Sequence, residues 1–305
     1  MRYIITLLMT ATPALAEVPA VVTDIPPVQA LVAQVMGDLG QPQQLLAKGA
    51  DEHDFQLRPS QAGAVAKAGL VVWIGPELTP WLESAMGTRP EGAASLALLD
   101  AKGTKLRSYA EGEGGQDHEE ADHDHEEAGH DHGSEDPHAW LDPGNAQAWL
   151  GLIAAELSRL DSENAGTYQA NAAAAAEGIA ALDVELEALL APAKGKPLVT
   201  FHDAYGYFGA HFGLDFAGSV SLGDASTPGA ARLAKLRAEI VAGHVVCLFP
   251  EIQHDPALVE QLVEGTGAKI GGALDPVGSS LEPGPGAYAA LLTGLAQTIA
   301  DCAGG

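Results

Sequence analysis

The feature that most constrains the fold of this chain is a long helical segment near its middle, at residues 161–191. This segment is rich in Ala, Glu and Leu, and four leucines recur at helical spacing in its second half. Two glycines apart, it contains no helix breaker before Pro192. We therefore expect one helix of about thirty residues, which restricts the motion of the parts it joins more than a flexible Gly- or Ser-rich linker would.

Short β-branched runs alternate with helical patterns on both sides of this segment, which is typical of parallel sheets. The expected strands lie at residues 18–25, 70–75, 95–100, 197–201, 216–221, 245–250 and 269–273. The expected helices include residues 26–37, 58–69, 204–212, 228–242, 256–265 and 286–302. The sequence predicts an α/β fold of two lobes, residues 17–160 and 192–305, each with a parallel-type sheet flanked by helices, joined by one long rigid helix.

The first residues have the layout of a signal peptide. Arg2 precedes an apolar run, and residues 14–16, Ala-Leu-Ala, fit the rule of small residues at a cleavage site. No later segment offers about 18 consecutive apolar residues, the length that a membrane-spanning helix needs. We expect residues 1–16 to be removed and a soluble, periplasmic protein to begin at Glu17; a buried N-terminal strand is the alternative.

The charge of the chain is strongly negative and partly concentrated in one segment. The formal net charge is −26, and residues 108–135 contribute eleven Asp and Glu but no Lys or Arg. This sign argues against nucleic acid as a partner and is compatible with attracting cations. Because residues 108–135 also lack hydrophobic periodicity, we expect a disordered insertion within the first lobe.

The chain has two cysteines, Cys247 and Cys302. Export from the cytoplasm permits a disulfide between them, and two buried free thiols are the alternative. Neither belongs to a CxxC motif, which argues against redox catalysis and against a thiolate zinc site.

Eleven histidines are divided between the insertion and the ordered parts of the chain. Outside the insertion, His202 follows an expected strand, His53 lies in a polar loop before a helix, and His138 lies where order resumes after the insertion. Three neutral imidazoles from separate loops suit zinc. The spacing alone does not show that they converge, so hydrogen-bonded loop histidines remain the alternative at this point. We expect His211, His244 and His254 to lie away from the metal.

Several segments, in the same order along the chain, resemble the metal-binding solute-binding proteins of ABC transporters for zinc and manganese, and within them the zinc-uptake, ZnuA, type. The segments are GADEHDFQLRPSQ, LVVWIGPELTPWLE, DPHAWLDP, TFHDAYGYFGAHFGL, VVCLFPEIQ and GGALDPVG, with the His-rich insertion directly before DPHAWLDP. The resemblance implies two α/β lobes joined by a long rigid helix, with one metal ion in the cleft between them.

Carried over residue by residue, the resemblance makes His53, His138 and His202 the zinc ligands. The fourth ligand is Glu52, beside the first histidine, or Asp275, at the position where manganese-type relatives use a carboxylate, or water. Three histidines favour Zn(II) over manganese, which prefers oxygen ligands. The resemblance also implies a disulfide between the two cysteines.

The expected function is a receptor that captures Zn(II) outside the cytoplasm and delivers it to the membrane permease of an ABC transporter, without catalysis and as a monomer. The insertion contributes weak auxiliary metal ligands, namely His118, His123, His125, His130 and His132; simple solubility is its alternative role. Competing functions are a secreted zinc hydrolase with Glu52 or Asp275 as base, a manganese-type relative and a metal buffer. No HExxH or GxSxG motif supports the hydrolase.

Overall fold

The computed structural model describes residues 18–109, 135–221 and 228–304. The predicted signal peptide lies outside the described residues, and so do the five histidines of the insertion. The two ends of the insertion lie together: Ser108 and Glu135 form an antiparallel bridge, and the Asp136 backbone N–H donates to the Arg107 carbonyl at 2.9 Å. None of the described helices is long and apolar enough to cross a membrane.

The first sheet lies in the first half of the chain, and all of its strands are parallel. Its order is β2-β1-β3-β4. The strands are β1 (Val21–Thr23), β2 (Gln43–Gln44), β3 (Leu70–Trp73) and β4 (Ala94–Ala97). The helical elements of this half are α1 (Pro26–Met36), η1 (Gly37–Leu39), α2 (Pro59–Lys67) and α3 (Pro80–Met86). Pro at the start of α1, α2 and α3 fits the first helical turn, where no intrahelical N–H bond is lost.

The central strands β1 and β3 are buried on both faces, as parallel strands between helices require. In β3 the side chains alternate between two clusters. Leu70 and Val72 belong to the large core that also contains Leu31 of α1. Val71 and Trp73 belong to a smaller cluster on the other face, near α2 and α3. The apolar run of this strand is therefore explained by burial on both sides.

The second sheet repeats this arrangement after the long helix. Its parallel strands have the order β6-β5-β7-β8. They are β5 (Pro197–Thr200), β6 (Asp215–Ser219), β7 (Cys247–Leu248) and β8 (Lys269–Ile270). The helices are α6 (Gly206–Phe212), α7 (Ala230–Val241), α8 (Ala257–Val263) and α9 (Ala287–Ala303). Leu198 and Cys247 point into the large core, whereas Val199 and Leu248 pack in a separate cluster with Leu236 of α7.

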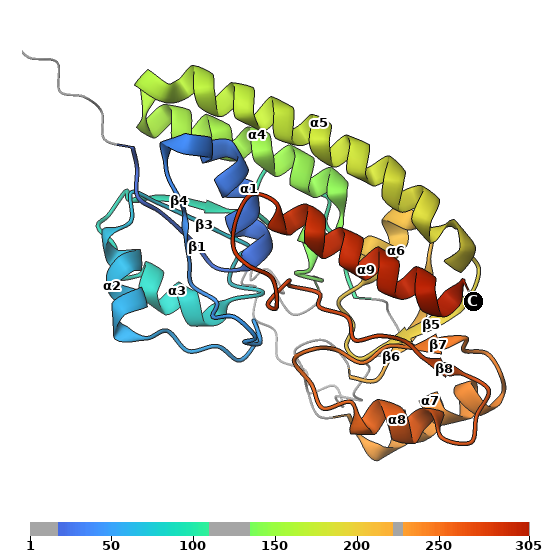
Figure 1. Ribbon diagram of the computed structural model, residues 1–305. Helices are drawn as coiled ribbons and strands as arrows, with labels where there is room; N and C mark the ends of the chain where they lie inside the picture. The colour runs from blue at the N-terminus through green and yellow to red at the C-terminus, as the bar shows by residue number, and fades with distance from the viewer. Residues whose placement is uncertain (1–17, 110–134, 222–227, 305) are drawn as a thin grey trace, which may run out of the picture.

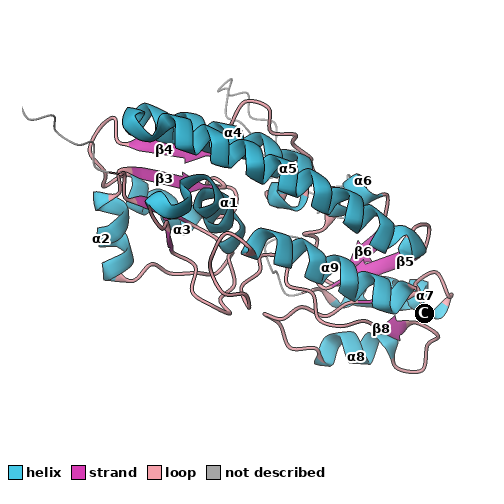
Figure 2. Ribbon diagram, turned by 45° about the horizontal axis from the view of Figure 1, so that its top comes forward, coloured by secondary structure: helices cyan, strands magenta, loops and turns pink. Residues whose placement is uncertain are grey.

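Two antiparallel helices pack side by side, and the longer of them extends from the first sheet to the second (Figures 1 and 2). The short turn η2 (Ala139–Leu141) leads into α4 (Pro143–Leu160), and α5 (Ala165–Leu190) returns over 26 residues between the turns η3 (Ser162–Asn164) and η4 (Ala191–Ala193). This confirms the predicted long helix. The C-terminal helix α9 packs against both α5 and α1, and the large core continues from the first sheet through α4, α5 and α9 to the second. The shared core resists separation of the sheets.

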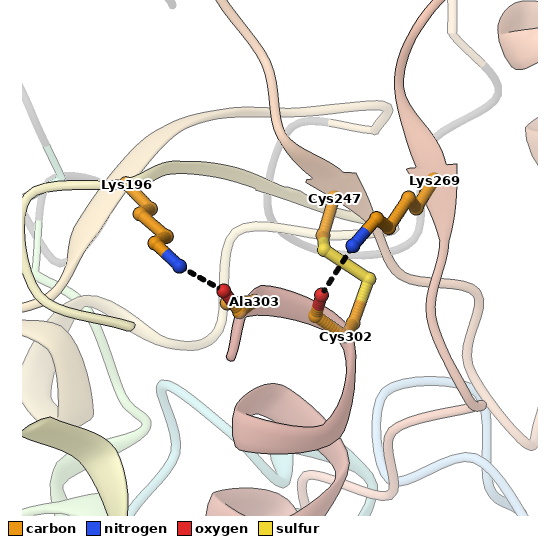
Figure 3. Close-up of a disulfide and its surroundings, with 5 residues drawn as sticks. All are labelled: Lys196, Cys247, Lys269, Cys302 and Ala303. Carbon is orange, nitrogen blue, oxygen red and sulfur yellow. Dashed lines mark hydrogen bonds between the residues drawn. A yellow bond between two sulfur atoms is a disulfide. The ribbon is translucent and has the colours of Figure 1, made fainter. Parts of the chain in front are cut away.

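The predicted disulfide is present and joins α9 to the second sheet. Cys247 of β7 is bonded to Cys302 in the last turn of α9. Figure 3 shows two lysines beside it that donate to the end of the same helix: Lys269 Nζ to the Cys302 carbonyl at 3.5 Å, and Lys196 Nζ to the Ala303 carbonyl. The last carbonyls of a helix have no partners within the helix. The two lysine side chains supply hydrogen bonds and positive charge there, and so stabilise the C-terminal end of α9.

Candidate metal centre

The three predicted ligand histidines come together between the two sheets. His53 lies in the loop between β2 and α2, His138 directly precedes η2, and His202 follows the carboxyl end of β5. His138 and His202 are buried, and the His53 side chain is 9% exposed. Loops at the carboxyl ends of parallel strands are where open α/β sheets present their functional groups, and here the loops of two sheets meet.

The ring nitrogens lie at distances that suit one metal ion. His138 Nε2 and His202 Nε2 are 3.4 Å apart. The His53 ring centroid lies 5.4 Å from that of His138 and 5.7 Å from that of His202. One ligand atom each from Glu52, His53, His138 and His202 can be chosen so that all four lie within 4.8 Å of one another. Tetrahedral zinc bonds of about 2.0–2.1 Å place neighbouring ligand atoms about 3.4 Å apart, so only a small contraction is needed.

A buried carboxylate orients His138. Asp136 Oδ1 accepts from His138 Nδ1 at 2.8 Å and from the His138 backbone N–H at 3.0 Å. With its Nδ1 occupied, His138 directs the lone pair of Nε2 toward the centre of the group. Burial, together with the charge of His202, lowers the pKa of His138 well below its usual value. His138 is therefore a neutral imidazole that is ready to coordinate.

A second carboxylate, Glu251, performs the same task for His202. Glu251 Oε2 lies 2.6 Å from His202 Nδ1, and Glu251 Oε1 accepts from the Tyr205 hydroxyl at 2.9 Å. Burial lowers the pKa of His202, but the carboxylates of Glu251, Glu52 and Asp51 outweigh burial and raise it to about 9. Without a metal ion, His202 is therefore protonated near neutral pH, whereas the facing His138 is neutral.

Glu52 adds an oxygen to the three nitrogens. Its side chain is buried, and Oε1 has no hydrogen-bond partner among the described residues and lies 3.9 Å from His53 Nε2. Burial raises the pKa of Glu52 to about 8. The Trp81 indole N–H donates to the Glu52 carbonyl at 2.8 Å and fixes the loop that carries both Glu52 and His53. A buried carboxyl oxygen without a hydrogen-bond partner, beside three imidazoles, fits the binding of a cation.

Asp275, the other predicted candidate for the fourth ligand, lies outside this group of ligand atoms. Its Oδ1 accepts from the Ser279 backbone N–H at 2.9 Å and from Gln253 Nε2 at 3.2 Å. Its Oδ2 accepts from the backbone N–H and the hydroxyl of Ser280 at 2.9 and 2.6 Å. Both oxygens therefore stabilise the loop that follows β8.

Two of the other described histidines lie away from the group and have partners of their own. His211 of α6 lies between Asp142 Oδ1, 2.9 Å from Nδ1, and Asp183 Oδ1, 2.7 Å from Nε2. His244 is exposed and lies 2.9 Å from Glu239. His254 is not part of the group with Glu52 either. Asp136 and Glu251 were not expected from the sequence, although Asp136 stands two residues before His138 and Glu251 follows β7.

Two parallel α/β units, held by a long helix and a shared core, with a buried histidine group between them, define a metal-binding solute-binding protein. A family model described as "Zinc-uptake complex component A periplasmic", ZnuA, matches residues 21–302. The chain belongs to the ZnuA family. Family members are zinc-uptake proteins and not enzymes, so this chain is a binding protein and the hydrolase interpretation is set aside.

Individual relatives can be aligned with this chain over almost its whole length. The "High-affinity zinc uptake system protein ZnuA" of Paracoccus denitrificans is 55% identical over 96% of this chain and 94% of its own length. The solved "Crystal structure of ZnuA" has a TM-score of 0.74 at 25% identity and covers 93% of this chain and 99% of its own. The periplasmic zinc binding protein TroA of Treponema pallidum has the same fold, with a TM-score of 0.75 at 19% identity, and covers 93% of this chain and 99% of its own.

Proposed function

We propose that this chain is a periplasmic receptor that captures Zn(II) between its two sheets and delivers it to the permease of an ABC transporter. The observation that carries the proposal is the convergence of three imidazole nitrogens and one carboxyl oxygen in a buried group. Nitrogen-rich sites of this kind favour zinc over manganese. The names of the relatives support zinc as the cargo. A monomer with one ion fits a group whose ligands all come from one chain.

We propose His53, His138, His202 and Glu52 as the ligands. Glu52 is preferred to Asp275 because its Oε1 lacks a hydrogen-bond partner among the described residues, whereas Asp275 is engaged by Ser279 and Ser280. Four protein ligands close the coordination shell and leave no open position for a reacting water, as suits a carrier. We also propose that residues 17–160 and 192–305 form two lobes joined by residues 161–191. Helix α9 of the second lobe packs against α1 of the first and against α5.

A zinc titration separates this buried site from the His-rich insertion. Residues 110–134 are replaced by a short Gly-Ser linker, which keeps the bridge between Ser108 and Glu135. Because the proposed ligands all lie outside this segment, both proteins should bind one zinc ion tightly in competition with a chelator. Only the intact protein should bind further, weaker zinc. Loss of the tight site on replacement would refute the assignment, and failure of the intact protein to bind zinc would refute the proposed function.

Delivery of zinc to the permease is tested by growth of cells that lack either protein. If the chain is a receptor, growth on scarce zinc should need both this chain and the permease. A metal buffer would support growth without the permease.

Replacing Glu251 by Gln should weaken zinc binding by about 10- to 100-fold, the range found when a residue that orients a metal-bound histidine is changed. Gln keeps the shape of the side chain but removes the charge that holds His202 Nδ1, 2.6 Å away. Chelator competition measures the change. Glu239→Gln is the matched control, because Glu239 pairs with an exposed histidine far from the group. Equal affinities of the two variants would show that Glu251 does not act on the site.

A further inference from the structure

A second group of potential metal ligands adjoins the first. One ligand atom each from His202, Glu251 and His254 can be chosen so that the three lie within 4.8 Å of one another. His202 belongs to both groups. Its Nε2 faces His138, whereas its Nδ1 faces Glu251. The two groups are therefore separated by a single imidazole ring.

His254 is the most exposed member of the two groups. Its side chain is 21% exposed, compared with 9% for His53 and 4% for His202. His254 lines the same narrow cleft as Glu52, His53 and Glu251. The side chain that solvent reaches most easily thus lies beside the buried ligands.

The structure holds the His254 ring in a fixed place. The ring stacks on Phe201, with centroids 4.2 Å apart and an angle of 18° between the planes. The His254 backbone N–H donates to the Glu251 carbonyl at 3.3 Å, which closes a turn after β7. His254 Nε2 lies 3.8 Å from Glu251 Oε2. An imidazole nitrogen and a carboxylate oxygen are thereby presented together beside the buried site.

We propose that Glu251 and His254 form an outer, transient binding position for a divalent transition metal ion, through which the ion passes on its way to and from the buried site. The inference rests on the proposed function and concerns the route of the ion. An ion at the outer position contacts one nitrogen and one oxygen, so it is held weakly. The inner group offers three nitrogens and one oxygen and holds it tightly. Glu251 Oε2, 2.6 Å from His202 Nδ1, is shared between this histidine and the outer position.

A residue that binds the ion in transit affects the rates of zinc binding differently from a residue that only supports the fold. Stabilising the passing ion lowers the barrier in both directions and leaves the free and bound end states unchanged. His254→Phe removes the nitrogen and retains a ring to stack on Phe201. Association and dissociation of zinc should both become slower by about tenfold, which corresponds to about 1.4 kcal/mol in the barrier, while the equilibrium affinity should stay the same.

Stopped-flow tryptophan fluorescence with zinc ions alone measures both rates in the full-length protein, since the Trp140 ring lies 5.2 Å from that of His138. His244→Phe is the matched control, because His244 is exposed and pairs with Glu239. Unchanged rates in His254→Phe would overturn the proposal. Faster dissociation with weaker affinity would also overturn it, because His254 would then act in the bound state. If the wild-type protein binds no zinc, the proposed function fails instead.

Discussion

Replacing His138 with alanine should weaken zinc binding by at least about 100-fold. Four-ligand structural zinc sites in zinc-finger peptides bind with about 10–16 kcal/mol. On that scale each of four ligands accounts for about 3 kcal/mol, or roughly 150-fold in affinity. His138 should lie at the upper end, because its side chain is buried and Asp136 fixes its orientation at 2.8 Å. Its loss leaves His53, His202 and Glu52 around a gap that only water can fill. Chelator competition on the purified protein measures the affinity.

The control for this experiment is His244→Ala, which removes an imidazole that is exposed and paired with Glu239. Its zinc affinity should equal that of the wild-type protein. Circular dichroism of both variants without zinc establishes that the fold is retained. A His138→Ala protein that is folded and binds zinc as the wild type does would contradict the assignment of His138 as a ligand.

The architecture was predictable because burial imposes patterns on the sequence. β3 and β5 are buried on both faces, so they appear as apolar runs, and α5 appears as a long stretch without Pro. Strand β2 gave no such signal: its two glutamines are not buried, and it is defined only by pairing with β1. The helix α3 begins with Pro80 in a segment that the prediction left unassigned. Strand ends were placed too late, because the residues directly after most strands, such as Ile74 and Phe249, are apolar and buried in loops.

The site was predictable only in part. His202 could be proposed as a ligand because it follows a strand, but the convergence of His53, His138 and His202 depends on packing between sheets and was inferred from family resemblance. The choice between Glu52 and Asp275 needed hydrogen-bond partners, which no sequence pattern provides. Glu251 was overlooked because a single glutamate after a strand resembles many surface residues. Its distance of 2.6 Å from His202 reveals its role.

Zinc affinity should rise steeply with pH because the empty site carries protons that the metal must displace. Glu251, Glu52 and Asp51 raise the pKa of His202 to about 9 against the effect of burial, and burial raises the pKa of Glu52 to about 8. Below each pKa the group holds a proton that coordination removes. Each displaced proton changes affinity by about tenfold per pH unit. His138, whose pKa is lowered, adds nothing in this range.

The expected profile has two slopes. Between pH 8 and 9, His202 holds its proton and Glu52 does not, so these two groups should make affinity rise by about tenfold per unit. Below pH 7 both groups are protonated, and the rise should be about 100-fold per unit. Chelator competition across pH 6–9 measures the slopes, and calorimetry in buffers of different ionisation enthalpy counts the protons released. Glu52→Gln has no carboxyl proton to lose, so its slope below pH 7 should fall to about tenfold per unit. An affinity that stayed constant between pH 6 and 9 would mean that the empty site holds no protons. The buried carboxylates would then not set the charge of His202.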